Sequence, residues 1–229
     1  LDSYSLITSA QSIREEQIEK TTKQLALNIP LAPDIPPQIM QRTIALYLAL
    51  KNFCKNHQWD AVNIKCQYEF SKEYRTVPCV ALSMLADDGI TASCEGDIPN
   101  TVSMMILHFL SGSVVTYGDA LSWKDNVVTF SPCGFLPLSM GASGIRIQNF
   151  MKHPGFSGIQ VCGVLRPEKV TYLRLVEDIG NFHILYGTGN GLNTQPRSGC
   201  MPALDVELDG SIETFRKTLA GQHYAIAYG

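Results

Sequence analysis

The sequence predicts an α/β segment followed by a mostly antiparallel β-domain. In the first part, residues 38–57 carry a long helical pattern, and residues 61–66 read as a short strand that follows it. In the second part, short apolar runs are punctuated by Gly, Asp, Asn and Pro, as in antiparallel barrels and sandwiches. We therefore expect residues 1–90 to be the C-terminal part of a Rossmann-like α/β domain, and residues 91–229 to form a C-terminal β-barrel or sandwich.

Apolar spacing and turn residues define the other elements expected before residue 90. Residues 11–28 have helical spacing, and a proline-rich connector at 29–37 separates them from the second helix. A short apolar helix or strand is expected at residues 78–86. A strand at 90–93 then leads into the sequence Cys94-Glu95-Gly96-Asp97.

The second part is expected to open with a helix up to residue 110. Pro99 fits its first turn, and its core-facing positions would be Met104, Met105, Leu107 and Leu110. Six strand-like runs follow, at residues 114–117, 126–130, 158–165, 169–176, 181–187 and 203–208. A final helix at 212–219 leads to a strand at 225–228.

Composition narrows the class of protein. A net charge of −3 over 229 residues gives no indication of a nucleic-acid or anionic-membrane partner. No apolar run reaches the roughly 18 residues that a membrane span needs. The cysteine count of seven is odd and no CxxC pair occurs, so we expect reduced, mostly buried thiols in a cytoplasmic protein. The chain opens on Leu1 rather than methionine, and we expect it to be part of a longer protein.

Two acids flank a glycine in the sequence Cys94-Glu95-Gly96-Asp97, directly before the helix that contains Pro99. Carboxylates at a helix start lie near the positive end of the helix dipole and are well placed to bind a cation or to move a proton. The simpler alternative is that Asp97 is a helix cap.

Glu69 and His223 complete a candidate set with Asp97. Glu69 follows the strand at 61–66, and ligands of open α/β sheets bind at the carboxyl ends of strands. Two carboxylates and an imidazole suit manganese, iron or cobalt, which can hold two adjacent sugar oxygens and stabilise an enediolate. Taken singly, Glu69 also fits an exposed loop acid, and His223 fits a core or interface histidine.

Three further residues are weaker candidates for sugar contacts: Gln67, Trp123 and Arg146. Trp123 can stack on a sugar face, but it also fits a core position. The glycine-rich residues 187–191 lack the Lys-Ser/Thr of a phosphate loop, which favours a β-turn.

Several segments resemble, in the same order, segments of the L-fucose isomerase family and its L-arabinose isomerase relatives. They are residues 65–69 (KCQYE), 77–81 (VPCVA), 92–97 (ASCEGD), 110–119, 167–175 (PEKVTYLRL) and 221–229. The resemblance covers about residues 55–229. It implies an aldose–ketose isomerase with two α/β domains and a C-terminal β-domain, acting on an open-chain sugar such as L-fucose or L-arabinose.

The resemblance also implies a cofactor and residue roles. The family uses a divalent metal, usually Mn²⁺, and by motif its ligands fall on Glu69, Asp97 and His223. Glu69 and Asp97 would also be the acid/base pair of the enediol mechanism. A homo-oligomer is implied, with the site completed by missing N-terminal domains or by a neighbouring subunit. Ser131 stands close to the position where many members carry histidine, and this favours the alternative of a non-catalytic carbohydrate-binding or regulatory relative, or an inactive fragment.

Overall fold

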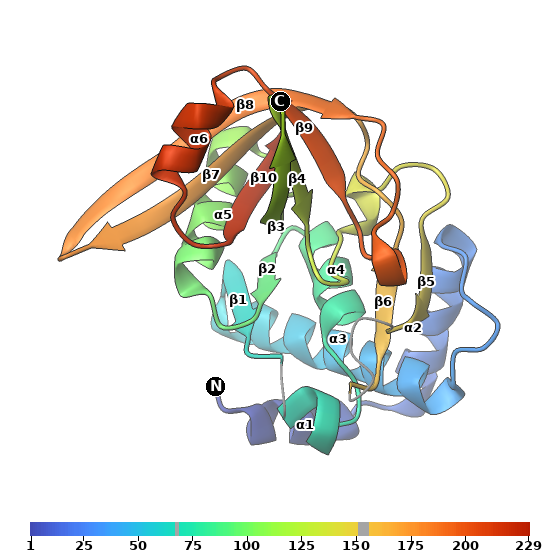
Figure 1. Ribbon diagram of the computed structural model, residues 1–229. Coiled ribbons are helices and arrows are strands. Elements are labelled where there is room, and N and C mark those ends of the chain that lie inside the picture. The colour runs from blue at the N-terminus through green and yellow to red at the C-terminus, as the bar shows by residue number, and fades with distance from the viewer. Residues whose placement is uncertain (67–68, 151–155) are drawn as a thin grey trace.

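The computed structural model describes residues 1–66, 69–150 and 156–229, and it places a barrel above a layer of helices (Figure 1). Before the barrel come α1 (Ser3–Gln11), α2 (Glu15–Asn28), α3 (Pro37–His57), β1 (Ala61–Ile64), a π-helix (Glu69–Glu73), α4 (Cys79–Asp87), β2 (Thr91–Cys94) and α5 (Ile98–Ser111). The barrel strands are β3 (Thr116–Lys124), β4 (Val127–Ser131), β7 (Lys169–Asp178), β8 (Asn181–Leu192), β9 (Leu204–Leu208) and β10 (His223–Tyr228). The remaining named elements are β5 (Arg146–Asn149), β6 (Ile159–Cys162) and α6 (Ile212–Thr218).

The six barrel strands close in the order β10-β3-β4-β9-β8-β7, and all their pairings are antiparallel. The prediction of a C-terminal antiparallel barrel is therefore confirmed. β7 and β8 pair along ten residues and form a long hairpin that extends away from the rest of the molecule (Figure 1). The predicted strand at residues 158–165 is present as β6, but it lies outside the barrel and pairs with β5, which the sequence pattern did not reveal.

Successive side chains of β10 point to opposite faces of the strand, and one of these faces packs against α5. Ala225 and Ala227 belong to the core cluster that contains Met104 and Leu107 of α5. Tyr224 and Ile226, on the opposite face of the strand, belong to a second cluster. Because His223 shares the period of Ala225, it faces the same side as α5.

α5 begins and ends as the sequence predicts. Asp97 caps it, because its Oδ1 accepts a hydrogen bond from the backbone N–H of Asn100 at 2.9 Å. Gly112 ends the helix with a positive φ of 64°, a conformation that glycine adopts without steric cost. The predicted core face is only partly right. Met104 and Leu107 are buried, but the helix turns Leu110 outward and leaves it 78% exposed.

β1 and β2 form a parallel pair, with Ala61 to Ile64 opposite Thr91 to Cys94. Two parallel strands with helices around them fit an α/β segment, while the larger Rossmann-like sheet stays a prediction. The boundary near residue 90 also stays a prediction. Each of the two core clusters contains residues from both sides of residue 90. One cluster includes Ile64 and Ala225, and the other includes Ile44 and Tyr224.

The helix predicted at residues 11–28 begins later in the structure, at Glu15, and a separate helix, α1, precedes it with a break near Ser12.

The cysteines also differ in part from the prediction of reduced thiols. Five of them are free and buried: Cys54, Cys66, Cys79, Cys94 and Cys133. Cys162 is disulfide-bonded, which corrects the prediction at that position. Among the described residues, no helix combines the length and the apolar character that crossing a membrane requires.

Candidate active site

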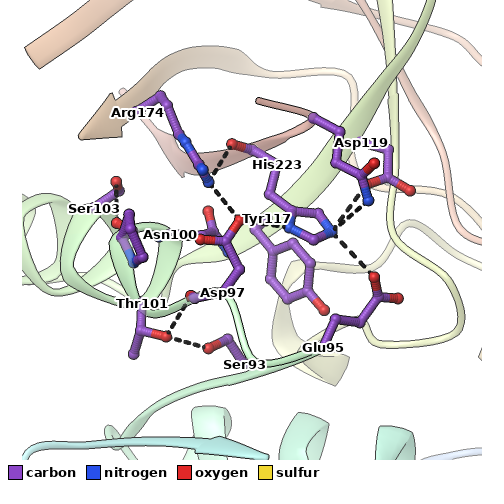
Figure 2. Close-up of polar contacts among 12 residues, drawn as sticks. Ser93, Glu95, Asp97, Asn100, Thr101, Ser103, Tyr117, Asp119, Arg174 and His223 are labelled. Carbon is purple, nitrogen blue, oxygen red and sulfur yellow. Dashed lines mark hydrogen bonds and ion pairs between the residues drawn. The ribbon is translucent and has the colours of Figure 1, made fainter. Parts of the chain in front are cut away.

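Asp97 and His223, two of the residues singled out in the sequence, lie in direct contact. Nδ1 of His223 is 2.8 Å from Oδ2 of Asp97 (Figure 2). The imidazole is almost fully buried, with 5% of its side chain exposed, and the Asp97 side chain is 16% exposed. This contact joins the start of α5 to the first residue of β10, so it ties the α/β segment to the barrel.

The turn between β2 and α5 sets the direction of the Asp97 side chain. Glu95 and Gly96 both have positive φ, 68° and 77°, so the chain reverses within two residues. Such a conformation is uncommon for a residue other than glycine. Asn63 of β1 supports the turn from below, since its amide donates to Ser93 Oγ at 2.8 Å and to Thr101 Oγ1 at 3.0 Å.

His223 is surrounded by carboxylates on its other side as well. Asp119 of β3 is its register partner across the β10–β3 pair, and Oδ1 of Asp119 lies 3.0 Å from Nε2. Oε2 of Glu95 lies 3.4 Å from the same nitrogen. The ring of Tyr117 meets the imidazole edge-on, with 5.2 Å between ring centroids. Figure 2 shows the imidazole held between these groups.

Arg174 of β7 supplies a cation to this cluster. Its Nη1 donates to Oδ2 of Asp97 at 2.6 Å and to the backbone oxygen of His223 at 3.2 Å. The side chain is only 11% exposed, so the ion pair is shielded from water. A Cβ on Gly221 would lie 2.8 Å from the guanidinium, and Gly221 also has a positive φ of 72°, so this position needs glycine.

The charges of the site follow from these contacts. Burial lowers the pKa of His223, but contacts with Asp119, Asp97 and Glu95 outweigh it and raise the pKa to about 11. Burial raises the pKa of Asp97, but His223 and Arg174 together hold it well below its usual range. For Glu95, the contact with His223 lowers the pKa, while burial and Cys133 outweigh it, so its pKa is raised. Without a bound cation, the site therefore holds an imidazolium against the ionised carboxylate of Asp97.

Glu69, the third predicted ligand, lies on the first residue of the π-helix and is exposed. Within the described residues, one group of three His, Cys, Asp or Glu has ligand atoms that all lie within 4.8 Å of one another, and it consists of Cys94, Glu95 and Cys133. Glu69, Asp97 and His223 are therefore not gathered into such a group. The role of Glu69 stays a prediction.

The structure describes two of the three weaker candidates for sugar contacts. Gln67 lies outside the described residues. Trp123 lies near the end of β3, 39% exposed and opposite Val128. Arg146 is an exposed residue of β5, opposite Cys162. Their assignment to sugar binding stays a prediction.

Sequence reasoning missed three residues of the cluster. Glu95 was noted but given no role, and Asp119 and Arg174 were given none although both lie within segments that resemble the isomerase family. The pairing register of β10 with β3 and β7 is what brings Asp119 and Arg174 to His223. A pattern read along one strand does not contain that register.

The groups around His223 have the donor chemistry of a Mn²⁺ site, namely carboxylate oxygens and an imidazole nitrogen. Among the described residues they are not gathered into a metal-sized group, so a cation would have to draw them together. Oδ1 of Asp119 lies 3.0 Å from Nε2 of His223 as its ion-pair partner, so a cation at Nε2 would take the place of the imidazolium proton. A protonated imidazole binds no metal, so cation and proton would compete for His223.

A cavity of about 450 Å³ opens beside this corner. It runs along the whole of β1, between this strand and residues Leu1 to Leu6, and its lining includes Phe70, which follows Glu69, and Gly96, which precedes Asp97. Asn63 and Lys65 contribute polar groups to the same wall. Its volume falls within the range of small-molecule sites.

Comparison with known proteins finds relatives that carry one name. The chain is 27% identical over 198 residues to a sulfoquinovose isomerase of Priestia megaterium, covering 82% of this chain and 44% of the relative. It is 24% identical over 238 residues to a sulfoquinovose isomerase of Clostridium sp. strain MSTE9, covering 100% and 53%. It is 26% identical over 206 residues to that of Alkalicoccus urumqiensis, covering 86% and 45%. The chain thus spans about half the length of these relatives. No family model matches it.

Proposed function

We propose that this chain is part of an aldose–ketose sugar isomerase that acts on an open-chain aldose through an enediol intermediate. The observation that carries the proposal is the 2.8 Å contact between Asp97 and His223, which are 126 positions apart in the sequence. The names of the relatives support the same class of reaction, since each is called an isomerase of a sugar. A cytoplasmic homo-oligomer remains part of the proposal.

The reaction moves a proton between carbons 1 and 2 of the sugar, and this requires carboxylates that can accept and return it. Glu69 and Asp97 are the proposed pair. Arg174 donates to Asp97 and so orients this carboxylate. The cavity beside the pair supports the proposal, because neighbours of both residues line it.

His223 and its surroundings have a structural part in this scheme. The imidazole contacts Asp97 from the barrel side, and Asp119 and Glu95 fix the ring in turn. A divalent metal of the Mn²⁺ class would be held by Glu69, Asp97 and His223, and when bound it would polarise the sugar carbonyl and stabilise the negative charge of the enediolate.

The first test uses the full protein that carries this sequence, supplied with Mn²⁺ and assayed against a panel of aldoses. The panel contains L-fucose and L-arabinose, because the sequence resembles enzymes for them, and sulfoquinovose, because the relatives are named for it. Conversion of at least one aldose to its ketose is expected. Deuterium exchange at carbon 2 during turnover would mark the enediol route. Absence of turnover with every sugar would overturn the isomerase proposal.

The second test addresses Glu69. Glu69→Gln is expected to lower turnover by about 10²–10⁴-fold at Mn²⁺ concentrations that saturate the variant, since a general base contributes on this order. Glu73→Gln is the matched control, because Glu73 is also exposed and ends the same π-helix. Unchanged turnover in Glu69→Gln would remove this residue from the mechanism.

A non-catalytic carbohydrate-binding relative is the second candidate. One observation favours it, the serine at position 131, because many members of the L-fucose isomerase family carry histidine close to this position. The buried hydroxyl of Ser131 donates to the backbone oxygen of Pro202 at 2.6 Å, so it stabilises the local backbone. Sugar binding without turnover across the whole panel would select this alternative.

A further inference from the structure

Buried thiols gather on the far side of Glu95 from His223. Four cysteines from separate segments take part, and all are at most 8% exposed: Cys66 after β1, Cys79 at the start of α4, Cys94 at the end of β2 and Cys133 after β4. They are far apart in the sequence, and only the packing of the barrel on the α/β segment brings Cys133 to the others.

Cys133 joins the members of this thiol cluster. Its Sγ donates to Oε1 of Glu95 at 3.0 Å. Cys133 also lies near enough to Cys79 and Cys94 to raise the pKa of both thiols, and Cys66 raises the pKa of Cys94. The ligand atoms of Cys94, Glu95 and Cys133 all lie within 4.8 Å of one another.

We propose that Cys94, Cys133 and Glu95 bind a thiophilic divalent cation of the Zn²⁺ class, with a fourth ligand from the adjacent thiol of Cys79 or Cys66. A tetrahedral zinc site with Zn–S distances near 2.3 Å places neighbouring sulfur atoms roughly 3.8 Å apart. Ligand atoms that already lie within 4.8 Å need only a small contraction to reach this geometry. Thiolates select zinc over the harder manganese, so this site and the proposed sugar site take different cations.

Cation binding displaces the protons of the thiols. Hydrogen bonding to Cys133 and burial raise the pKa of Cys79, and hydrogen bonding to Cys133 and Cys66 does the same for Cys94, so the cation-free cluster holds neutral thiols. A divalent cation that enters forms three metal–thiolate bonds, to Cys94, Cys133 and the fourth ligand, and releases three protons to solvent. One doubly charged cation and three thiolates change the net charge of the core by only −1.

A cluster of cysteines can also be ordinary packing, since free cysteine behaves as a small apolar residue. Glu95 distinguishes this cluster from packing, because a carboxylate is not needed among apolar side chains and is costly to bury. The turn at Glu95, with its positive φ of 68°, aims one carboxylate oxygen at Cys133 and the other at His223. The thiol cluster thus contains one preformed anionic ligand.

This inference does not rest on the proposed isomerase activity. Its sulfur ligands are thiols that the sugar chemistry does not use, and its test has no turnover readout. A protein that isomerises no sugar would still be expected to bind the thiophilic cation, and an active isomerase without this site would overturn only the present inference.

The test is a titration of the chelator-treated protein with Cd²⁺, a spectroscopic substitute for Zn²⁺. It is done under argon without added thiol, so that the disulfide of Cys162 stays intact. We expect thiolate-to-cadmium charge-transfer absorption that saturates at one equivalent and persists in excess Mn²⁺. Native mass spectrometry of the wild-type complex should show one metal gained and three protons lost. This second measurement needs no variant and is independent of any folding defect.

Variants assign the ligands. Cys133→Ser is expected to weaken Cd²⁺ binding by at least about 100-fold, and Glu95→Gln by about tenfold, while Cys54→Ser leaves it unchanged. Cys54 is the matched control, since it is an equally buried free thiol on α3. A missing charge-transfer band, an adduct that loses no protons, or full-strength binding in Cys133→Ser would overturn the proposal.

Discussion

The two sides of Glu95 solve the same problem, the burial of polar groups, in opposite ways. Toward His223, formal charges are kept and paired, with Arg174 and the imidazolium facing three carboxylates. Toward Cys133, the groups are weak hydrogen-bonding thiols that remain neutral when buried. The stability of the charged side therefore depends on each partner, because a buried charge that loses its partner is costly. The thiol side tolerates the loss of one hydrogen bond better, because its groups carry no charge.

His223→Ala should have the largest effect on the charged side. It leaves Glu95, Asp97 and Asp119 facing one another with Arg174 as the remaining cation. We expect a loss of about 3–5 kcal/mol in the free energy of unfolding, measured by urea denaturation. His183→Ala, at an exposed position of β8, should stay within about 0.5 kcal/mol of wild type. A loss below 1 kcal/mol in His223→Ala would show that the carboxylates do not need the imidazolium.

Arg174→Met should have the next largest effect. It keeps an unbranched apolar stem but removes the guanidinium and its hydrogen bonds to Asp97 and to the His223 backbone. A loss of about 2–3 kcal/mol is expected, in the range of hydrogen bonds to charged groups. Arg216→Met is the control, because Arg216 pairs with Glu213 at the surface, where both side chains are more than half exposed. That pair should contribute at most about 1 kcal/mol. Equal losses in the two variants would contradict the role of burial.

Glu95→Gln tests the residue shared by the two sides. Glutamine keeps the size and can still bond to Cys133, but it removes the charge that faces His223. We expect a loss of about 1–2 kcal/mol. Glu207→Gln, an exposed position on β9, should be neutral. A stabilised Glu95→Gln protein would mean that repulsion among the carboxylates outweighs their attraction to the imidazole.

Tyr117→Phe should have the smallest effect, and it probes the thiol side. The phenol oxygen lies 2.9 Å from Sγ of Cys94, and the ring stacks on Phe135. Phenylalanine keeps the stacking and removes one hydrogen bond, so a loss of about 1 kcal/mol is expected. Tyr186→Phe, 74% exposed on β8, should show no change. A loss as large as that of His223→Ala would remove the contrast between the two sides.

The sequence by itself determined the local elements of this protein. The cap at Asp97, the stop at Gly112 and the alternation along β10 are written in neighbouring residues, so α5 and the barrel strands could be predicted. The candidates Asp97 and His223 also followed from their positions at the ends of apolar runs. Local geometry depends on neighbours in the chain, and for this reason the sequence pattern is sufficient for it.

Only the tertiary structure decided what surrounds those two residues. Asp119 and Arg174 reach His223 through strand register, and Cys133 reaches Glu95 through the packing of the barrel on α4 and β2. The same packing turned Leu110 toward solvent, against expectation. Register and packing between distant segments depend on pairings that no local pattern encodes. For this physical reason, the contacts of Asp119, Arg174 and Cys133 could not be predicted from the sequence.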